Sequence, residues 1–486
     1  MILFYFIYHY GWTHERYFTT PVGVWAYYVV PAVSAGLLFA SLQLQSSLRI
    51  KLALVLLSTG FSLCGAELFL QILDSRVLKL ELPLHWLTFP SYGTVEAVSE
   101  RLKGAKKFGV DFDTRSKLEV IADLRRKGID AYPGIPPRWL LDKSADGSLK
   151  SALIINSAEV LPLGGISNKV TVFCNENGDY TIYESDEHGF HNPTGIWGTG
   201  RIDIAALGDS FTQGACVQSD GNFVALIRKR YPGTVTLGGD DNGPLLMLAG
   251  IKEYVEYVKP KVVLWFYYEG NDLVDLMQEK NSRLLLRYIG SDFKQGLFGQ
   301  QSAIDRALTE YVDGQEKQLL ARRNTQKTLK SATAVLDLST VHIDSVIRLG
   351  HLRRRLGLVY GTSQHEKEHQ STTSKVEMEL FAKVLSRAKE SVGVWGGSLY
   401  FVYLPQWQRY ARPEVGDKHH DRVLTLAKTL GLPVIDIHRA FLAHGDPLAL
   451  FPFRQHGHYN MEGHRLVAEE VLRSISFGQP NSFSSR

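Results

Sequence analysis

The N-terminal part of the chain contains a long stretch, between Arg16 and Arg49, that carries no charged side chain. Its apolar part, residues 22–44, exceeds the roughly 20 residues that a helix needs to cross the hydrocarbon core of a bilayer. A second apolar stretch, residues 52–73, is interrupted only by Glu67 near its end. We therefore expect residues 1–75 to form a two-helix transmembrane hairpin, with a pair of buried helices in a soluble protein as the alternative.

The charges around the two expected spans do not fix their orientation. Arg16 precedes the first span, Arg49 and Lys51 lie in the link at 45–51, and further basic residues follow the second span. The count of basic residues is therefore almost balanced between the two sides. Two spans would place the N-terminus and everything after residue 75 on the same side of the membrane.

The overall composition excludes several classes of protein. The chain has 486 residues, 54 Lys and Arg, and 50 Asp and Glu, which gives a formal charge of +4. A charge so close to zero argues against a nucleic acid partner. The three cysteines include no CxxC pair, so neither a zinc ribbon nor a thioredoxin-type motif is present.

The segment after the hairpin, residues 76–198, is expected to be a small accessory region. Residues 168–174 and 179–184 are predicted to be two strands of a β-hairpin around Asn177, which is followed by glycine. Residues 115–127 are predicted to form a helix, which the following proline-rich segment ends.

Residues 199–476 alternate between short apolar strands and amphipathic helices, which predicts an α/β fold with a doubly wound parallel sheet. A basic, helical insertion at about 279–373 interrupts the alternation, and residues 477–486 are expected to be a disordered tail. The expected strands are 202–207, 234–237, 261–268, 399–404 and 433–437, and the expected helices are 222–231, 244–258, 376–391, 421–430 and 462–474.

Polar clusters follow two of these strands, at 208–214 and 269–272, and a third cluster, 456–464, precedes the last helix. Ligands bind beyond the carboxyl ends of strands in open parallel sheets. A serine nucleophile needs a base and preorganised donors for the oxyanion. The clusters supply Ser210 as nucleophile, the Asn271 amide as an oxyanion donor, and a C-terminal histidine as base.

These clusters resemble blocks I, III and V of the SGNH (GDSL) hydrolase family: LGDSFTQG, EGND and HGHYNMEGH. The resemblance covers about residues 200–475. It implies a flavodoxin-like sheet and a serine–histidine centre that acts on esters without a metal or organic cofactor. It assigns Ser210 as nucleophile, Asn271 as oxyanion donor and His458, five residues before Gly463, as the catalytic histidine.

The sequence departs from the family pattern at the third member of the triad. The family usually has Asp three residues before the histidine, where this chain has Gln455. Asp446 and Asp436 are the candidates that remain upstream, and a dyad in which a backbone carbonyl orients His458 is an equal alternative.

A second departure lies in TLGGDDNGP, which resembles block II of the family. The family's glycine falls at or near Asp241, with Gly238 and Gly243 on either side, so the amide that would donate to the oxyanion is open. Asp209 and Asp272 are expected to support the site, Asp209 by capping the helix that begins at the serine.

The remaining histidines of the last cluster have simpler interpretations. His456 and His458 could form a metal pair, but no acidic or cysteine ligand has suitable spacing, so we expect no metal. His464 is expected to be a packing residue.

Together these features predict a membrane-anchored serine hydrolase that cleaves O-acyl or O-acetyl esters, with an acylated carbohydrate as one candidate substrate. The alternatives are an O-acetyltransferase acting on envelope polysaccharide and a weakly active glycan-binding protein. We expect a bacterial inner-membrane location with the catalytic domain in the periplasm, where Cys174 and Cys216 could form a disulfide. The basic insertion is expected to be a solvated helical segment, and a surface that contacts anionic lipid or glycan is the alternative.

Overall fold

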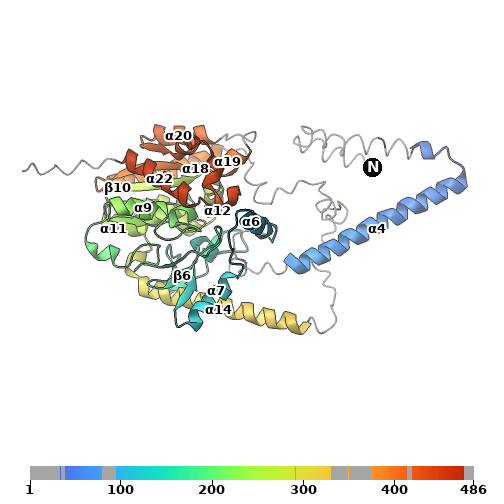
Figure 1. Cartoon of the computed structure of the whole chain (residues 1–486), viewed down its shortest axis with the longest axis horizontal. Helices are drawn as coiled ribbons and strands as arrows, with labels where there is room; N and C mark the ends of the chain where they lie inside the picture. The colour runs from blue at the N-terminus through green and yellow to red at the C-terminus, as the bar shows by residue number, and fades with distance from the viewer. Residues whose placement is uncertain are drawn as a thin grey trace, which may run out of the picture. The chain divides into compact units, whose positions relative to one another are not determined.

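The computed structural model describes residues 33, 39–78, 95–290, 292–329, 349, 375–412 and 419–475 (Figure 1). The chain divides into two compact units. One comprises Met1–Leu80 with Thr333–Gly361, and the other comprises Glu81–Ala332 with Thr362–Arg486. The accessory region and the α/β region therefore belong to the same unit.

The described part of the first unit is dominated by one long helix, α4 (Ser46–Leu78). Its segment Ser46–Leu70 is long and apolar enough to cross a membrane, since 25 helical residues extend about 37 Å. The expected polar link at 45–51 is instead helical from Ser46 onward, because no glycine or proline interrupts it. Most of the expected span at 22–44 lies outside the described residues.

The second unit contains a five-stranded sheet whose neighbouring strands are all parallel. The spatial order is β12-β11-β10-β8-β9, which is the flavodoxin-like order 2-1-3-4-5 read from the other edge. This confirms the predicted parallel α/β sheet and all five strands. Their bounds are β8 (Ile204–Leu207), β9 (Thr234–Thr236), β10 (Val262–Tyr268), β11 (Ser398–Leu404) and β12 (Val434–Asp436).

The central strand β10 is buried on both faces, which explains its continuous apolar sequence. Val263 and Trp265 pack into the core on one face, whereas Leu264 and Phe266 pack into the core on the other. The first core is closed by α10 (Pro244–Gly250), α18 (Lys375–Gly393) and α20 (His420–Thr429), and the second by α9 (Phe223–Arg230), α21 (Ile437–Ala443) and α22 (Met461–Ser474) (Figure 1).

The predicted helix at 244–258 is not a single α-helix. After α10 the backbone makes a π-helical turn, η5 (Ile251–Val255), and the helical segment ends with α11 (Glu256–Val258).

The other short elements of this unit are η3 (Pro137–Leu140), β2 (Leu141–Lys143), β3 (Leu149–Ser151), β4 (Ile154–Ile155), β5 (Ala158–Glu159), η4 (Ile196–Thr199), α8 (Ser210–Gln213), α12 (Asp272–Glu279), α13 (Arg283–Leu286), η6 (Arg287–Ile289), η7 (Leu297–Gly299), α19 (Gln408–Ala411), η10 (Pro447–Leu450) and η11 (Pro452–Arg454).

The accessory region forms a small layer of its own around the predicted hairpin. Strands β6 (Val170–Val172) and β7 (Ile182–Glu184) are antiparallel, as predicted, and β1 (Ala131–Pro133) pairs parallel with β6. Helices α6 (Val95–Lys107) and α7 (Lys117–Arg126) precede these strands.

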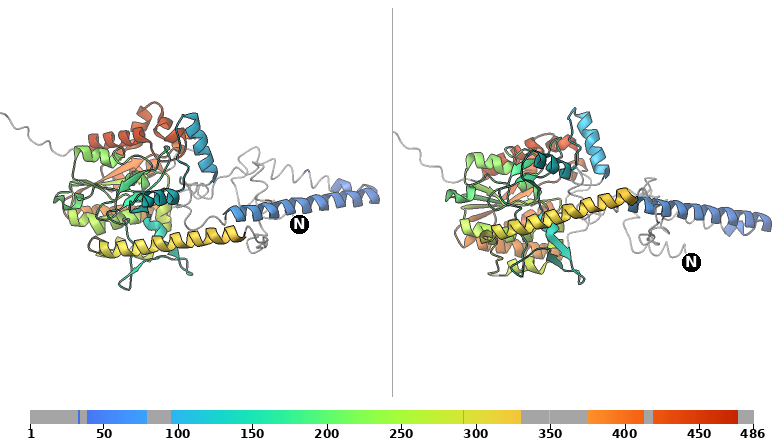
Figure 2. Two further views of the ribbon diagram at one scale, coloured as in Figure 1. Left: turned by 60° about the horizontal axis from the view of Figure 1, so that its bottom comes forward. Right: turned by 90° about the horizontal axis from the view of Figure 1, so that it is seen from below.

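The insertion contributes one long helix, α14 (Gln301–Leu329), to the accessory layer. Its Leu319 packs with Val120 and Ile121 of α7, and Figure 2 shows α14 running beside this region. The described part of the insertion is therefore mostly helical. The arginine-rich part at 353–355 and the expected tail at 477–486 lie outside the described residues.

Candidate active site

Ser210 lies at a tight turn between a strand and a helix. Strand β8 ends at Leu207, and α8 begins at Ser210. Asp209 caps this helix, as predicted, because its Oδ1 accepts a hydrogen bond from the Phe211 N–H at 3.0 Å. Burial raises the pKa of Asp209 to about 7.

His458, from the C-terminal part of the α/β region, contacts Ser210. Its Nε2 lies 2.8 Å from Ser210 Oγ. The histidine precedes α22, whose N-terminus is capped by Asn460 through the Gly463 N–H at 3.1 Å. A base within hydrogen-bond distance can take a serine proton, and the structure brings the two predicted catalytic side chains within that distance.

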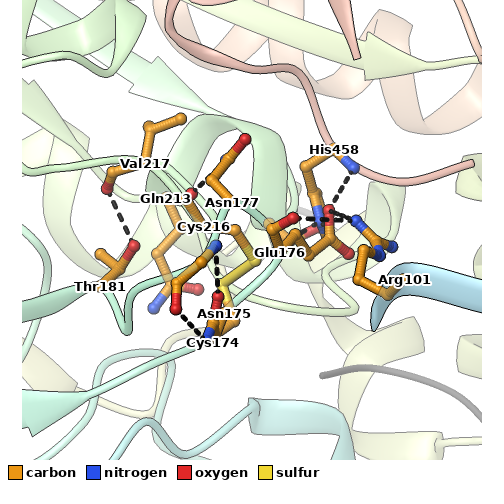
Figure 3. The surroundings of a disulfide bond; sticks show 12 residues. Arg101, Cys174, Asn175, Glu176, Asn177, Thr181, Gln213, Cys216, Val217 and His458 are labelled. Carbon is orange, nitrogen blue, oxygen red and sulfur yellow. Dashed lines mark hydrogen bonds and ion pairs between the residues drawn. A yellow bond between two sulfur atoms is a disulfide. The ribbon is translucent and has the colours of Figure 1, made fainter. Parts of the chain in front are cut away.

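The carboxylate beside His458 is Glu176, which lies in the loop between β6 and β7. Its Oε1 lies 3.3 Å from His458 Nδ1, and its Oε2 accepts a hydrogen bond from the His458 backbone N–H at 2.8 Å. Figure 3 shows Glu176 between His458 and Arg101, whose Nη1 lies 3.4 Å from Glu176 Oε2.

The electrostatic surroundings lower the pKa of the Glu176 carboxyl and raise the pKa of the His458 imidazole. Burial would raise the pKa of Glu176, but the charges of Arg101 and His458 and the hydrogen bonds from His458 outweigh it and lower that pKa. Burial would lower the pKa of His458, but the Glu176 carboxylate outweighs it and raises the pKa of the imidazole. Glu176 is therefore an ionised partner that stabilises the imidazolium.

The two aspartates considered from sequence are engaged elsewhere. Asp436 caps α21 through the His438 N–H at 3.2 Å and lies 3.1 Å from His420 Nε2. Asp446 pairs with Arg454 at the surface. Glu176 takes the position expected for Asp436 or Asp446, because the accessory hairpin reaches the imidazole.

Sequence reasoning missed Glu176 because this residue precedes the α/β region and lies in no recognised block. The signals that could have found it are close by. Cys174 and the Asn177 turn flank it in the sequence, and both contact the loop that follows α8.

A disulfide joins Cys174 to Cys216, as considered from sequence, with the two Cα atoms 5.1 Å apart. It links the hairpin that carries Glu176 to the loop after Ser210. Two hydrogen bonds reinforce the link: Asn177 Nδ2 donates to the Cys216 carbonyl at 2.7 Å, and Thr181 Oγ1 donates to the Val217 carbonyl at 3.0 Å (Figure 3).

The loop after β9 offers one candidate oxyanion amide. The N–H of Gly238 donates to Thr236 Oγ1 at 3.0 Å, and that of Gly243 donates to Glu279 Oε1 at 2.7 Å. The amides of Gly239, Asp240 and Asn242 are also hydrogen-bonded. Within the described residues, only the amide of Asp241 in this loop has no acceptor. Its φ of +57° is the conformation that favours glycine, in agreement with the position inferred for the family glycine.

Asn271 and Asp272 follow the end of β10. The Asn271 side chain makes no hydrogen bond with the described residues, so its amide is available to a ligand. Asp272 is buried, and its Oδ2 accepts a hydrogen bond from the Tyr268 N–H at 3.1 Å. Burial and the nearby Asp209 raise the pKa of Asp272 well above its ordinary value.

The histidines considered as metal ligands have other partners. Glu176, Cys216 and His458 present ligand-type atoms close together, but the Cys216 sulfur is in the disulfide and Glu176 accepts hydrogen bonds from His458. The His456 ring packs edge-on against Trp407. His464 is fully buried and accepts a hydrogen bond from a backbone N–H of α9, as expected of a packing residue.

No family model and no curated protein matches this chain. Among solved structures, it is similar to a G-D-S-L family lipolytic protein from Desulfitobacterium hafniense DCB-2, at 12% identity over 57% of this chain and 100% of that one, with a TM-score of 0.30. It is also similar to the acetylxylan esterase Axe2 from Geobacillus stearothermophilus, at 15% identity over 57% and 94%, with a TM-score of 0.30. At these TM-scores, neither likeness carries an inference about the chemistry of this chain.

Proposed function

We propose that this chain is a serine hydrolase that cleaves O-acyl esters through Ser210, His458 and Glu176. His458 takes the proton of Ser210 as the serine oxygen attacks the acyl carbonyl. The alcohol then leaves with that proton, and water releases the acyl group from the acyl-enzyme by the same route. The observation that carries this proposal is the 2.8 Å distance between Ser210 Oγ and His458 Nε2, with Glu176 at the other ring nitrogen.

The negative charge on the attacked carbonyl oxygen needs donors that are fixed in advance. We assign this role to the Asn271 side-chain amide and the backbone amides of Ser210 and Asp241. Two observations support the assignment. The Asn271 side chain and the Asp241 amide have no hydrogen-bond partner within the described residues, and each lies beyond the carboxyl end of a strand of the same parallel sheet.

We further propose that α4 anchors the enzyme in a bilayer, with the catalytic unit in the bacterial periplasm. Helix α4 has the length and composition for a span. The disulfide between Cys174 and Cys216 is typical of an oxidising compartment such as the periplasm. O-acetyl groups on envelope carbohydrate are accessible from that side.

The test is hydrolysis of p-nitrophenyl acetate by the full chain in detergent, wild type against Ser210→Ala. Release of nitrophenol that depends on Ser210 is expected, and its absence would contradict the proposal. Adding an acetylated or free oligosaccharide separates the alternatives. Acetyl transfer faster than hydrolysis would favour an O-acetyltransferase, and binding without turnover would favour a glycan-binding protein.

A further inference from the structure

We propose that helix α6 belongs to the catalytic apparatus and that Arg101 is a positioning residue. It holds Glu176 against residues 451–460, the segment before α22 that carries His458 (the His458 loop). The inference rests on the proposed function. The Arg101 guanidinium contacts both segments at once: Nη1 lies 3.4 Å from Glu176 Oε2 and donates to the Glu176 carbonyl at 3.4 Å, and Nη2 donates to the His456 carbonyl at 2.9 Å.

These contacts are buried, so they act strongly on the charge state of Glu176. The Arg101 and Glu176 side chains are 7% and 3% exposed. A carboxylate removed from water needs a cation and hydrogen bonds to remain charged. The Arg101 guanidinium supplies the cation, and the His458 backbone N–H supplies a hydrogen bond to Oε2. Arg101 therefore stabilises the charged form of Glu176 that His458 requires.

Two glycines permit this close approach. A Cβ at Gly457 would lie 2.6 Å from Glu176 Oε2 and 3.0 Å from Arg101 Nη1. A Cβ at Gly104 of α6 would lie 2.8 Å from Gln455 Nε2 and 2.9 Å from Phe453 Cβ. Larger residues at either position would push α6 and the His458 loop apart.

Gln455 stands where the resembling family usually places its acid, and in this chain it has a different role. Its Nε2 donates to the Glu100 carbonyl of α6 at 3.0 Å. In this chain the carboxylate beside His458 is that of Glu176, and Gln455 ties the loop to the helix that carries Arg101.

The His458 loop also needs external support because its backbone is strained. Phe453 and Arg454 have φ of +52° and +61°, in the region that non-glycine residues rarely occupy. Contacts with Gly104 of α6, and a hydrogen bond from Trp407 Nε1 to the Arg454 carbonyl at 3.0 Å, hold this conformation.

The charges around His458 predict a diagnostic pH effect. The carboxylates of Glu176, Asp240 and Asp209 raise the pKa of the imidazole, and the Arg101 guanidinium forms an ion pair with Glu176. The buried Lys117 lies near Asp240. Loss of Arg101 removes a positive charge, which raises the pKa of His458, whereas Glu176→Gln removes a negative charge and lowers it.

The experiment compares Arg101→Ala and Arg101→Lys with Arg125→Ala in the full chain. Arg125 is a matched control: it lies in the same region and also contacts a carboxylate and a backbone carbonyl, those of Glu316 and Ala131. For Arg101→Ala we expect kcat to fall on the order of 10- to 100-fold at nearly constant KM, the loss typical when a partner that orients a functional group is removed. The acid limb of kcat/KM should move to higher pH, and added guanidinium should restore part of kcat.

The inference would be overturned if Arg101→Ala kept a kcat within about twofold of wild type. It would also be overturned if kcat fell while the acid limb stayed in place and added guanidinium restored no activity. If Arg101→Ala does not fold, Arg101→Lys is the deciding variant, because lysine keeps the positive charge without the planar guanidinium. We expect this variant to have a reduced kcat and an acid limb close to that of wild type. Full activity of Arg101→Lys would overturn the inference. Failure of the proposed function is separate, because wild type itself would then show no Ser210-dependent hydrolysis.

Discussion

Glu176 Oε1 lies 3.3 Å from His458 Nδ1, although the two residues are 282 positions apart in the chain. The carboxylate comes from the accessory hairpin and the histidine from the loop before the last helix of the α/β sheet. The accessory region is therefore more than a spacer after the N-terminal helix, because the site is incomplete without its Glu176.

Replacing Glu176 with Gln should lower kcat by roughly 10²–10⁴, the order seen when an amide replaces a triad carboxylate, because the imidazolium loses its counter-charge. The measurement is steady-state hydrolysis of p-nitrophenyl acetate. Asp436→Asn and Asp446→Asn are the controls and should stay within about twofold of wild type. A large loss in either control, with Glu176→Gln unaffected, would return the acid role to the aspartates.

The pH dependence of kcat/KM should show an acid limb that reports His458. The serine is activated only when this imidazole is neutral, so activity falls as pH drops through its pKa. Because Glu176 raises that pKa, the limb should lie at higher pH than that of an unperturbed imidazole, and Glu176→Gln should move it to lower pH. A limb that stays in place in Glu176→Gln would show that this carboxylate does not act on the titrating group.

The Asn271 amide is the side-chain member of the assigned oxyanion donors. Asn271→Ala should lower kcat by roughly 10²–10³, as expected for the loss of one preorganised donor. Asp241→Gly is the companion variant and should retain activity within a few-fold, since only its amide is assigned and glycine suits the φ of +57°. A loss below tenfold in Asn271→Ala would count against its role.

The disulfide should contribute measurably to stability. In the chain-entropy model, a crosslink that closes a sequence separation of 42 residues contributes about 4 kcal/mol. Replacing both Cys174 and Cys216 with Ser should therefore lower Tm and also reduce kcat, because Glu176 lies two residues from Cys174. Cys64→Ser is the control. Equal Tm for wild type and the double variant would contradict this prediction.

The sequence was sufficient to predict the sheet and to single out Ser210 and His458, which the structure brings within 2.8 Å of each other, because strand periodicity and short motifs are local properties. Glu176 could not be predicted in the same way, since its approach to His458 depends on how the hairpin folds against the α/β core. The helical continuation of α4 through Arg49 and Lys51 was also missed, because flanking charges in a sequence resemble a loop as much as a helix end.

The insertion of α4 in lipid can be tested with a native probe. Cys64 lies inside the apolar segment Ser46–Leu70, and the other two cysteines form the disulfide. A membrane-impermeant maleimide should therefore leave the chain unlabelled in intact membranes and label it once detergent dissolves them. Rapid labelling before detergent is added would contradict a lipid-buried α4.

Ser210 is proposed as a nucleophile that His458 activates. The most direct test of this proposal is the reaction of the full chain with a fluorophosphonate, followed by peptide mass spectrometry. We expect a single adduct on Ser210, absent in Ser210→Ala and formed much more slowly in His458→Gln. An adduct on another residue, or equal labelling of Ser210 with and without His458, would contradict it.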